Sequence, residues 1–291
     1  TSNETGSEAT FPGESEPVSL EVAPDETSSQ EWERIEKEGQ RWVKSRVGEF
    51  VPKLVSSKPS SFFRLLFADQ KTVVSSLLAK MLPEGKRFKL EPRAPGSELD
   101  EVVRGPVLGI GTRGVVFEGT MVSSGEKFAM KMQYVQKGFF GQWPTRKEMV
   151  KEMQQELAVA DILKHAYGPE GVLSKGLVLP VETRRIRGYG EFITHPFTRT
   201  LLWNNITIFP VMKCTLADLV KIPNWPREAR LYVSKRLLEI IAAVHENGVV
   251  HSDIHEGNVL LKKGSGDVFF GDFYNRRGIS TMRAEGGENK R

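Results

Sequence analysis

The stretch LGIGTRGVVFEG, residues 108–119, constrains the fold of this chain more than any other segment. Its glycines, Gly109, Gly111 and Gly114, follow the spacing G-x-G-x-x-G, in which missing Cβ atoms let the backbone approach phosphate oxygens. The spacing alone occurs in many turns, and in a dinucleotide-binding domain it leads from a strand into a helix. Here β-branched and aromatic residues follow it, which predicts a turn between two strands. A Rossmann fold is therefore excluded.

Lys131, in FAMK, lies in a further strand-like stretch beyond this hairpin. A lysine on a strand usually lays its stem over apolar surface and keeps its ammonium in water. After a glycine-rich hairpin it can instead bind the α- and β-phosphates of a nucleotide. Such a lysine needs a carboxylate to orient it. Glu156, in MQQELAVADIL, lies on the next predicted helix with apolar neighbours and is the favoured candidate, with Glu152 one turn earlier as the alternative.

The stretch HSDIHEGNVLL places a His, an Asp and an Asn at fixed spacing before an apolar run. Asp253 is a candidate to accept or orient a hydroxyl proton, and Asn258 is a candidate to help hold Mg²⁺ near the phosphates. Because a hard cation needs oxygen ligands, Asp272 in GDF is the second predicted contributor. Each residue alone fits an ordinary turn. Their order after the hairpin, the lysine and the glutamate predicts one phosphotransfer site.

Composition divides the chain into five predicted segments. Residues 1–30 hold seven acidic residues and no Lys or Arg, so they are expected to be a disordered leader. Apolar residues at helical spacing in 31–99, notably over 62–82, predict an N-terminal helical extension packed on the main domain. The alternative is peripheral membrane association through residues 31–82. The remaining segments are a β-rich lobe with its hinge at 100–212, a partial helical lobe at 213–275 and a polar tail at 276–291.

The charge of the chain is uneven, because the net charge of +4 leaves about +11 beyond the acidic leader. Such a basic body favours phosphate-bearing ligands or anionic surfaces, or is simply solvated. The basic stretch TRRIRG, residues 183–188, either docks an acidic partner or is a solvated loop. Basic and aromatic residues are not interleaved, so nucleic-acid binding is not expected. Cys214 is the single cysteine, which excludes an intramolecular disulfide.

Residues 100–275 resemble the protein kinase fold and, more narrowly, the rhoptry kinase family of apicomplexan parasites. The resemblance rests on the ordered motifs above, on HSD in the catalytic loop, on the helical extension and on NNITIFPVMKCTLADLV. It implies an α+β, bilobal fold with a β-rich N-lobe and an incomplete helical C-lobe. It also implies binding of ATP and Mg²⁺ and transfer of the γ-phosphate to Ser/Thr hydroxyls of proteins. The implied localisation is secretion through the rhoptry to the host cell or the parasitophorous vacuole membrane, with a host protein as substrate or partner.

The same resemblance implies a set of site residues. Phe209 is expected near the gatekeeper position, with the adenine-facing hinge at 210–212. The nucleotide is expected to contact Gly109, Gly111, Gly114, Val116, Ala129, Lys131, Glu156, Phe209, Val211 and Met212. Phosphate transfer is expected to use Asp253, Asn258 and Lys131. Mg²⁺ is expected to bind Asn258 and Asp272.

Three residues depart from the family pattern. Ser252 replaces the Arg that pairs with a phosphorylated activation loop, His255 replaces a Lys that neutralises the transferred phosphate, and Tyr274 replaces the Gly of D-F-G. Only 19 residues follow Asp272, without an A-P-E element, so a truncated C-lobe is expected. Whether the chain is an active enzyme is therefore left open. The alternatives are a pseudokinase or nucleotide-binding interaction module, and a small-molecule kinase like the aminoglycoside and choline phosphotransferases, which share H-x-D-x-H-x-x-N.

Overall fold

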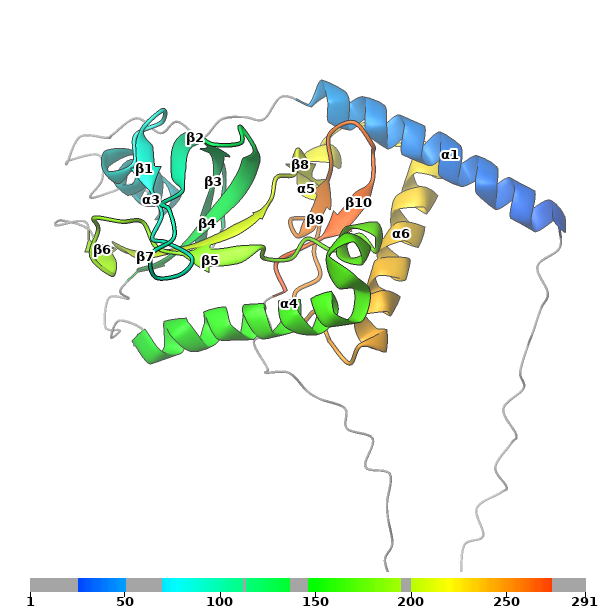
Figure 1. Ribbon diagram of the computed structural model, residues 1–291. Helices are drawn as coiled ribbons and strands as arrows, with labels where there is room; N and C mark the ends of the chain where they lie inside the picture. Colours follow the sequence, from blue (N-terminus) through cyan, green and yellow to red (C-terminus); the bar gives the residue numbers. More distant parts are fainter. Residues whose placement is uncertain (1–25, 51–69, 112–113, 137–145, 195–199, 274–291) are drawn as a thin grey trace, which may run out of the picture.

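The structure, a computed structural model, describes residues 26–50, 70–111, 114–136, 146–194 and 200–273. Most of the acidic leader, the segment 51–69, Tyr274 and the polar tail lie outside these residues. Two lobes are visible in Figure 1, one built around a curved sheet and the other around a long helix. The α+β, bilobal architecture predicted from the sequence is confirmed.

The N-lobe is a curved antiparallel sheet in the order β1–β2–β3–β4–β7–β5, with β6 paired to β7. In β3, buried side chains alternate with half-buried ones over most of the strand, the two-residue period of a strand with one face on a core. The edges of the sheet also meet, because Leu90 bridges Ile186. The strands are β1 (Arg87–Lys89), β2 (Glu101–Ile110), β3 (Gly114–Met121), β4 (Lys127–Gln136), β5 (Glu182–Arg184), β6 (Phe192–Thr194) and β7 (Thr200–Pro210).

The C-lobe consists of a helical part and a small three-stranded sheet in the order β10–β9–β8. Its elements are β8 (Cys214–Thr215), α5 (Leu216–Leu219), α6 (Arg227–Glu246), β9 (Val259–Leu261) and β10 (Val268–Phe270). Helix α4 (Arg146–Ser174) runs beneath the N-lobe sheet and reaches the C-lobe, where Leu163 joins the core (Figure 1). It therefore links the two halves of the predicted site.

Helices α1 (Glu26–Glu49) and α3 (Gln70–Met81) belong to the expected N-terminal extension. Helix α1 lies against α6, where a Cβ on Gly39 would come within 2.5 Å of the Glu228 carbonyl oxygen and of Tyr232 Cβ. Helix α3 buries Val74 and Leu78 completely in the N-lobe core. Both helices therefore pack on the main domain, as predicted, although Trp32 of α1 is 42% exposed. Residues 62–69 of the predicted helical stretch lie outside the described residues. In the part of the chain that the structure describes, no helix has the length and apolar character to cross a membrane.

Three local features are not apparent from the sequence patterns. Helix α1 begins at Glu26, inside the predicted disordered leader 1–30. Helix α4 continues across a kink at Gly168 (φ 68°, ψ 168°), after which a second helical stretch ends at Ser174. Pro169 is tolerated because it stands at the start of that stretch, where its missing N–H costs nothing. Leu238 stands at helical spacing with other apolar residues of α6, yet it is 68% exposed, because α6 turns a different face toward α1 and β10.

Candidate active site

The predicted glycine-rich hairpin lies between β2 and β3, with residues 112 and 113 outside the described residues. The amide of Gly111 donates to the carbonyl oxygen of Gly114 at 2.9 Å. A Cβ on Gly109 would meet no atom within 4 Å, whereas one on Gly114 would lie 3.3 Å from the Met132 carbonyl oxygen and 3.5 Å from the Lys131 stem. The hairpin therefore has open space at Gly109, and its backbone passes close over Lys131 at Gly114.

Lys131 connects the two lobes through its ion pairs. It lies on β4, opposite Val116 of β3 and Thr207 of β7. Its Nζ is 3.4 Å from Oε1 of Glu156 on α4 and 2.6 Å from Oδ1 of Asp272, which follows β10. The structure thus brings together three residues that the sequence analysis had predicted to share a site. The side chain of the alternative, Glu152, lies outside the described part of the chain.

Charge and burial shift the pKa values of Lys131, Glu156 and Asp272. Lys131 and Glu156 are 17% and 4% exposed, and Asp272 is 44% exposed. Burial alone would lower the pKa of Lys131, but attraction to both carboxylates outweighs it and raises that pKa. Burial raises the pKa of Glu156, which Lys131 only partly offsets. For Asp272, attraction to Lys131 outweighs burial and lowers the pKa. One ammonium thus faces two carboxylates, and the surplus negative charge suits a divalent cation.

The predicted catalytic loop connects α6 to β9. Asn258 is nearly buried, and its Nδ2 donates to the backbone oxygen of Asp253 at 2.9 Å. The amide of Gly271 donates to the backbone oxygen of Asn258 at 3.0 Å, so the loop is held beside the segment that carries Asp272. The carboxylate of Asp253 remains largely exposed. The two predicted metal ligands therefore lie on hydrogen-bonded neighbouring segments.

The ring of His251 packs beside this loop. Its ring lies against Phe270 and Phe273, with centroid distances of 4.1 and 4.8 Å. Its Nε2 lies 3.0 Å from the backbone oxygen of Gly271. Burial lowers the pKa of His251, which favours the neutral ring. This histidine therefore has a structural role, and it fixes the loop to the segment before Asp272.

An apolar cluster joins strands of both lobes beside these polar groups. It consists of buried Ala129, Val178, Phe209 and Phe269, against which half-buried Val116, Met212 and Leu260 pack. Four of these residues were predicted to contact a nucleotide, and Val178, Leu260 and Phe269 were not among the predicted contacts. Leu260 could have been found, because it stands two residues after Asn258 in the apolar run. Val211 is half-buried and lies outside this cluster.

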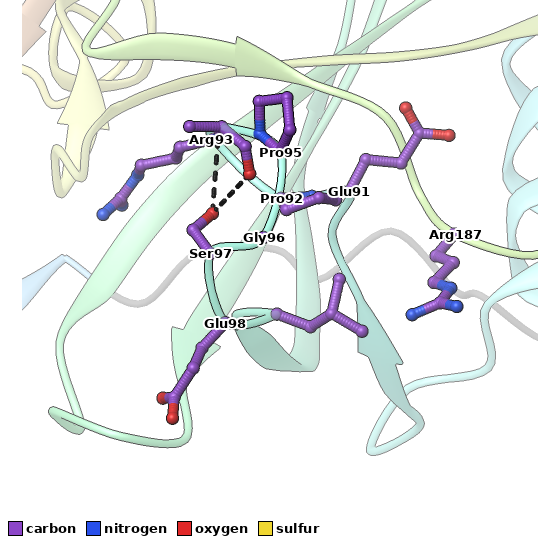
Figure 2. Close-up of a pocket in the computed structure, with 10 residues that line it drawn as sticks. Glu91, Pro92, Arg93, Pro95, Gly96, Ser97, Glu98 and Arg187 are labelled. Carbon is purple, nitrogen blue, oxygen red and sulfur yellow. Dashed lines mark hydrogen bonds between the residues drawn. The ribbon is translucent and has the colours of Figure 1, made fainter.

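A hollow of about 850 Å³ lies elsewhere, on the outer edge of the N-lobe. The loop 91–99 curls around it and Arg187 stands across from the loop (Figure 2). Within it, Arg93 is held by two hydrogen bonds to Glu182, at 3.0 and 3.1 Å. Its lining contains none of the predicted site residues, so this hollow is separate from the candidate active site.

The residues present fit Mg²⁺ better than a transition metal. Within the described ranges, no three His, Cys, Asp or Glu side chains gather in an arrangement that could hold an ion. Mg²⁺ commonly binds through one or two carboxylates together with substrate phosphates and water. The carboxylate of Asp272 and the side-chain amide oxygen of Asn258 supply that kind of partial ligand set.

Comparison with known proteins agrees with this arrangement. The model of the Kinase-like family matches residues 95–277. The Serine/threonine-protein kinase ROP18 of Toxoplasma gondii is 26% identical over 188 residues, which cover 60% of this chain and 33% of that protein. The chain therefore spans about a third of this curated relative.

Solved structures share the fold at low identity. ROP2 from Toxoplasma gondii, described as a virulence factor with a protein-kinase fold and no enzymatic activity, matches with a TM-score of 0.59, 18% identity and coverage of 82% of this chain and 63% of ROP2. The ROP18 kinase domain in complex with AMP-PNP and sucrose matches with a TM-score of 0.61, 19% identity and coverage of 81% and 65%. Since the family model spans more than half of the sequence, and the curved sheet and converging lobes agree with it, the chain belongs to the kinase-like family and is related to the rhoptry kinases of Toxoplasma gondii.

Proposed function

We propose that this chain forms the Mg·ATP-binding part of a protein kinase that transfers the γ-phosphate to Ser/Thr hydroxyls of proteins. The observation that carries the proposal is the convergence on Lys131 of Glu156 from α4 and Asp272 from the C-lobe. At one place, the ammonium of Lys131 is available to bind phosphate and the carboxylate of Asp272 is available to bind a cation. The nucleotide complex of the ROP18 kinase domain supports the same class of ligand for a relative.

Each part of the site has a chemical task in this proposal. The adenine packs against the apolar cluster that includes Ala129 and Leu260, and backbone amides of the hairpin contact the phosphates. Lys131 binds the α- and β-phosphates, and its carboxylate partner Glu156 keeps it oriented. Asp272 and Asn258 hold Mg²⁺, which when bound neutralises phosphate charge. This division of roles explains why the polar groups lie close to an apolar cluster.

Asp253 acts on the acceptor. Its carboxylate accepts the hydroxyl proton as the hydroxyl oxygen bonds to the γ-phosphorus, and the bond between that phosphorus and ADP breaks. The exposure of this carboxylate leaves room for a protein substrate. We propose a host protein as that substrate, reached after secretion through the rhoptry, because rhoptry kinases are among the similar proteins.

A second candidate is a nucleotide-binding or pseudokinase module without turnover. It is favoured by His255, which stands where a lysine would neutralise the transferred phosphate, and by the similarity to ROP2, which is described as having no enzymatic activity. The small-molecule kinase alternative rests on the loop pattern H-x-D-x-H-x-x-N, which includes the same histidine. The similarity to ROP18 favours a protein acceptor over a small alcohol.

The test is thermal unfolding of the full chain with and without Mg·ATP. Ligand at 100 times its dissociation constant stabilises the folded state by about 2.7 kcal/mol, which shifts the midpoint measurably. Lys131→Ala and Asp272→Ala should lose this shift. Lys127→Ala, which removes an exposed lysine from the same strand, should keep it. Cooperative unfolding of the wild-type chain with no shift would contradict nucleotide binding.

Phosphate transfer is then measured with γ-labelled ATP and a general protein substrate. Transfer that disappears in Asp253→Ala supports the kinase proposal and refutes the module without turnover. A Mg²⁺-dependent shift without transfer supports that second candidate. Transfer to an aminoglycoside or choline, but not to protein, would favour the small-molecule alternative.

A further inference from the structure

His255 is held by the amide of Gly257. The Gly257 N–H donates to Nδ1 of His255 at 3.0 Å. Because a backbone N–H can only donate, Nδ1 must offer a lone pair, and in a neutral imidazole the proton then lies on Nε2. One backbone hydrogen bond thus selects a single tautomer of the ring.

The nitrogen that carries the selected proton lies near Asp253. Nε2 of His255 lies 3.8 Å from Oδ2 of Asp253, longer than a hydrogen bond but within the distance of an ion pair. The two side chains are 49% and 60% exposed, so each has room to rotate and close this gap. Hydrogen bonds in catalytic sites are often long before substrate binds and tighten in the productive complex. Within the described residues, no other charged side chain lies at ion-pair distance from Asp253.

Gly257 makes this arrangement sterically feasible. A Cβ at this position would lie 2.7 Å from Cε1 and 2.9 Å from Nδ1 of His255, closer than such contacts allow. Gly257 does not lie in the left-handed region of positive φ, so its backbone angles do not require a glycine. A glycine is instead favoured because the imidazole ring occupies the space that a Cβ would take.

We propose that His255 is a positioning residue for Asp253 in the phosphotransfer site. Gly257 fixes the imidazole with its proton on Nε2, and that N–H binds Oδ2 of Asp253 so that Oδ1 faces the acceptor hydroxyl. The inference rests on the proposed function. It gives His255 a different task from that of the lysine which the family pattern places at this position. An imidazole that donates to the carboxylate orients the proton acceptor rather than neutralising the phosphate.

The tautomer is read from a two-bond ¹H–¹⁵N correlation spectrum of the full chain labelled at histidine, recorded at about pH 8, where a free histidine is neutral. The five histidines are distinguished by assigning His255 through its loss in His255→Gln. We expect one tautomer for this ring, with Nε2 protonated. A proton on Nδ1, or equal populations of both tautomers, would overturn the proposal.

Two variants test the neighbours of the ring. Gly257→Ala should displace the imidazole and mix its tautomers, while Gly48→Ala, whose Cβ would meet no atom within 4 Å, should leave the spectrum unchanged. Asp253→Ala should keep the tautomer, because the Gly257 bond remains, but accelerate exchange of the Nε2 proton with water several-fold. Unchanged exchange in Asp253→Ala would show that the ring only shapes the loop, and would refute positioning.

These readouts separate the inference from the proposed function. A wild-type chain with the expected tautomer but no Mg·ATP shift would refute the proposed function and leave His255 a loop-forming residue. Where phosphate transfer is detected, His255→Ala should lower kcat about 10-fold at constant KM for ATP, the scale seen when an outer-shell partner is removed. His255→Gln, whose amide can still donate to Asp253, should recover part of kcat. Equal values for both variants would contradict a role for the N–H.

Discussion

Replacing Lys131 with methionine tests the electrostatics of the candidate site most directly. The substitution keeps the approximate volume but removes the only lysine or arginine within ion-pair distance of Glu156 and Asp272 in the described ranges. At an effective dielectric constant of about 20, unit charges 3.4 Å apart attract by about 5 kcal/mol. Desolvation of the buried partners offsets much of this attraction in the intact pair. Removing one partner alone leaves the buried Glu156 uncompensated, so we expect the free energy of unfolding at pH 7 to fall by about 3 kcal/mol.

The pH dependence of that loss follows from Glu156. Burial already raises its pKa above the ordinary 4.5, and without Lys131 nothing comparable lowers it. The folded variant then binds a proton that the unfolded chain does not, so its stability rises as the pH falls from 7 toward 4.5. In the wild type, Asp272 does not change the stability over this pH range. Its pKa is lowered, so its contribution is fully present above the unfolded value of 3.8 and is lost only at lower pH.

The assay is urea unfolding of four proteins, the wild type, Lys131→Met, Glu156→Gln and the double variant, at pH 7 and pH 5. Neutralising Glu156 in the Lys131→Met background should recover about 2 kcal/mol of the loss at pH 7, a typical coupling energy for contacting charged residues. Lys127→Met, on the same strand but exposed, should change stability by less than about 1 kcal/mol. A coupling energy within about 0.5 kcal/mol of zero, or a loss that is equal at both pH values, would refute the electrostatic reasoning.

Two further predictions concern the scaffold. Arg104 on β2 is fully buried, and its three guanidinium nitrogens have no hydrogen-bond partner. The carboxylate of Glu84 lies 3.6 Å away. Arg104→Met should therefore be neutral or raise the free energy of unfolding by about 1–4 kcal/mol. A clear loss in urea unfolding, relative to the exposed control Arg87→Met, would contradict this. Gly39→Ala should cost about 1–3 kcal/mol by forcing α1 away from α6. Gly48→Ala on the same helix should be neutral or slightly stabilising, and equal effects of the two would refute close packing at Gly39.

The sequence predicted the parts of this structure that depend on local chemistry. Gly109 and Asn258 each fit an ordinary turn, but the order of the glycine hairpin, the lysine, the glutamate and the loop was specific enough to predict the strands and the loop that carry them. Glu156 was distinguished from Glu152 by its apolar neighbours, and these are what carry it into the core beside Lys131. The placement of these elements was therefore predictable from local sequence patterns.

Other features could not be predicted because tertiary contacts decide them. Val178 and Phe269 belong to the apolar cluster beside the candidate site, yet each stands in an ordinary apolar stretch that fits many buried positions. Leu238 fits a helical stripe as well as Tyr232 does, and only the placement of α1 and β10 selects the face that contains Tyr232. A Gly-Pro pair is typical of a helix end, but after the backbone turn at Gly168 a second helical stretch begins. No pattern in β2 indicated that Arg104 would be buried.

The fold by itself does not decide whether this chain turns over ATP. ROP2, described as lacking enzymatic activity, and the ROP18 kinase domain, solved with AMP-PNP, match it with TM-scores of 0.59 and 0.61. A difference that small cannot separate a catalyst from a binding module, because the same scaffold supports both. The decision therefore lies with individual side chains. In the proposed function, Lys131 and its two carboxylates determine whether nucleotide binds, and Asp253 with His255 determines whether a bound phosphate can be transferred.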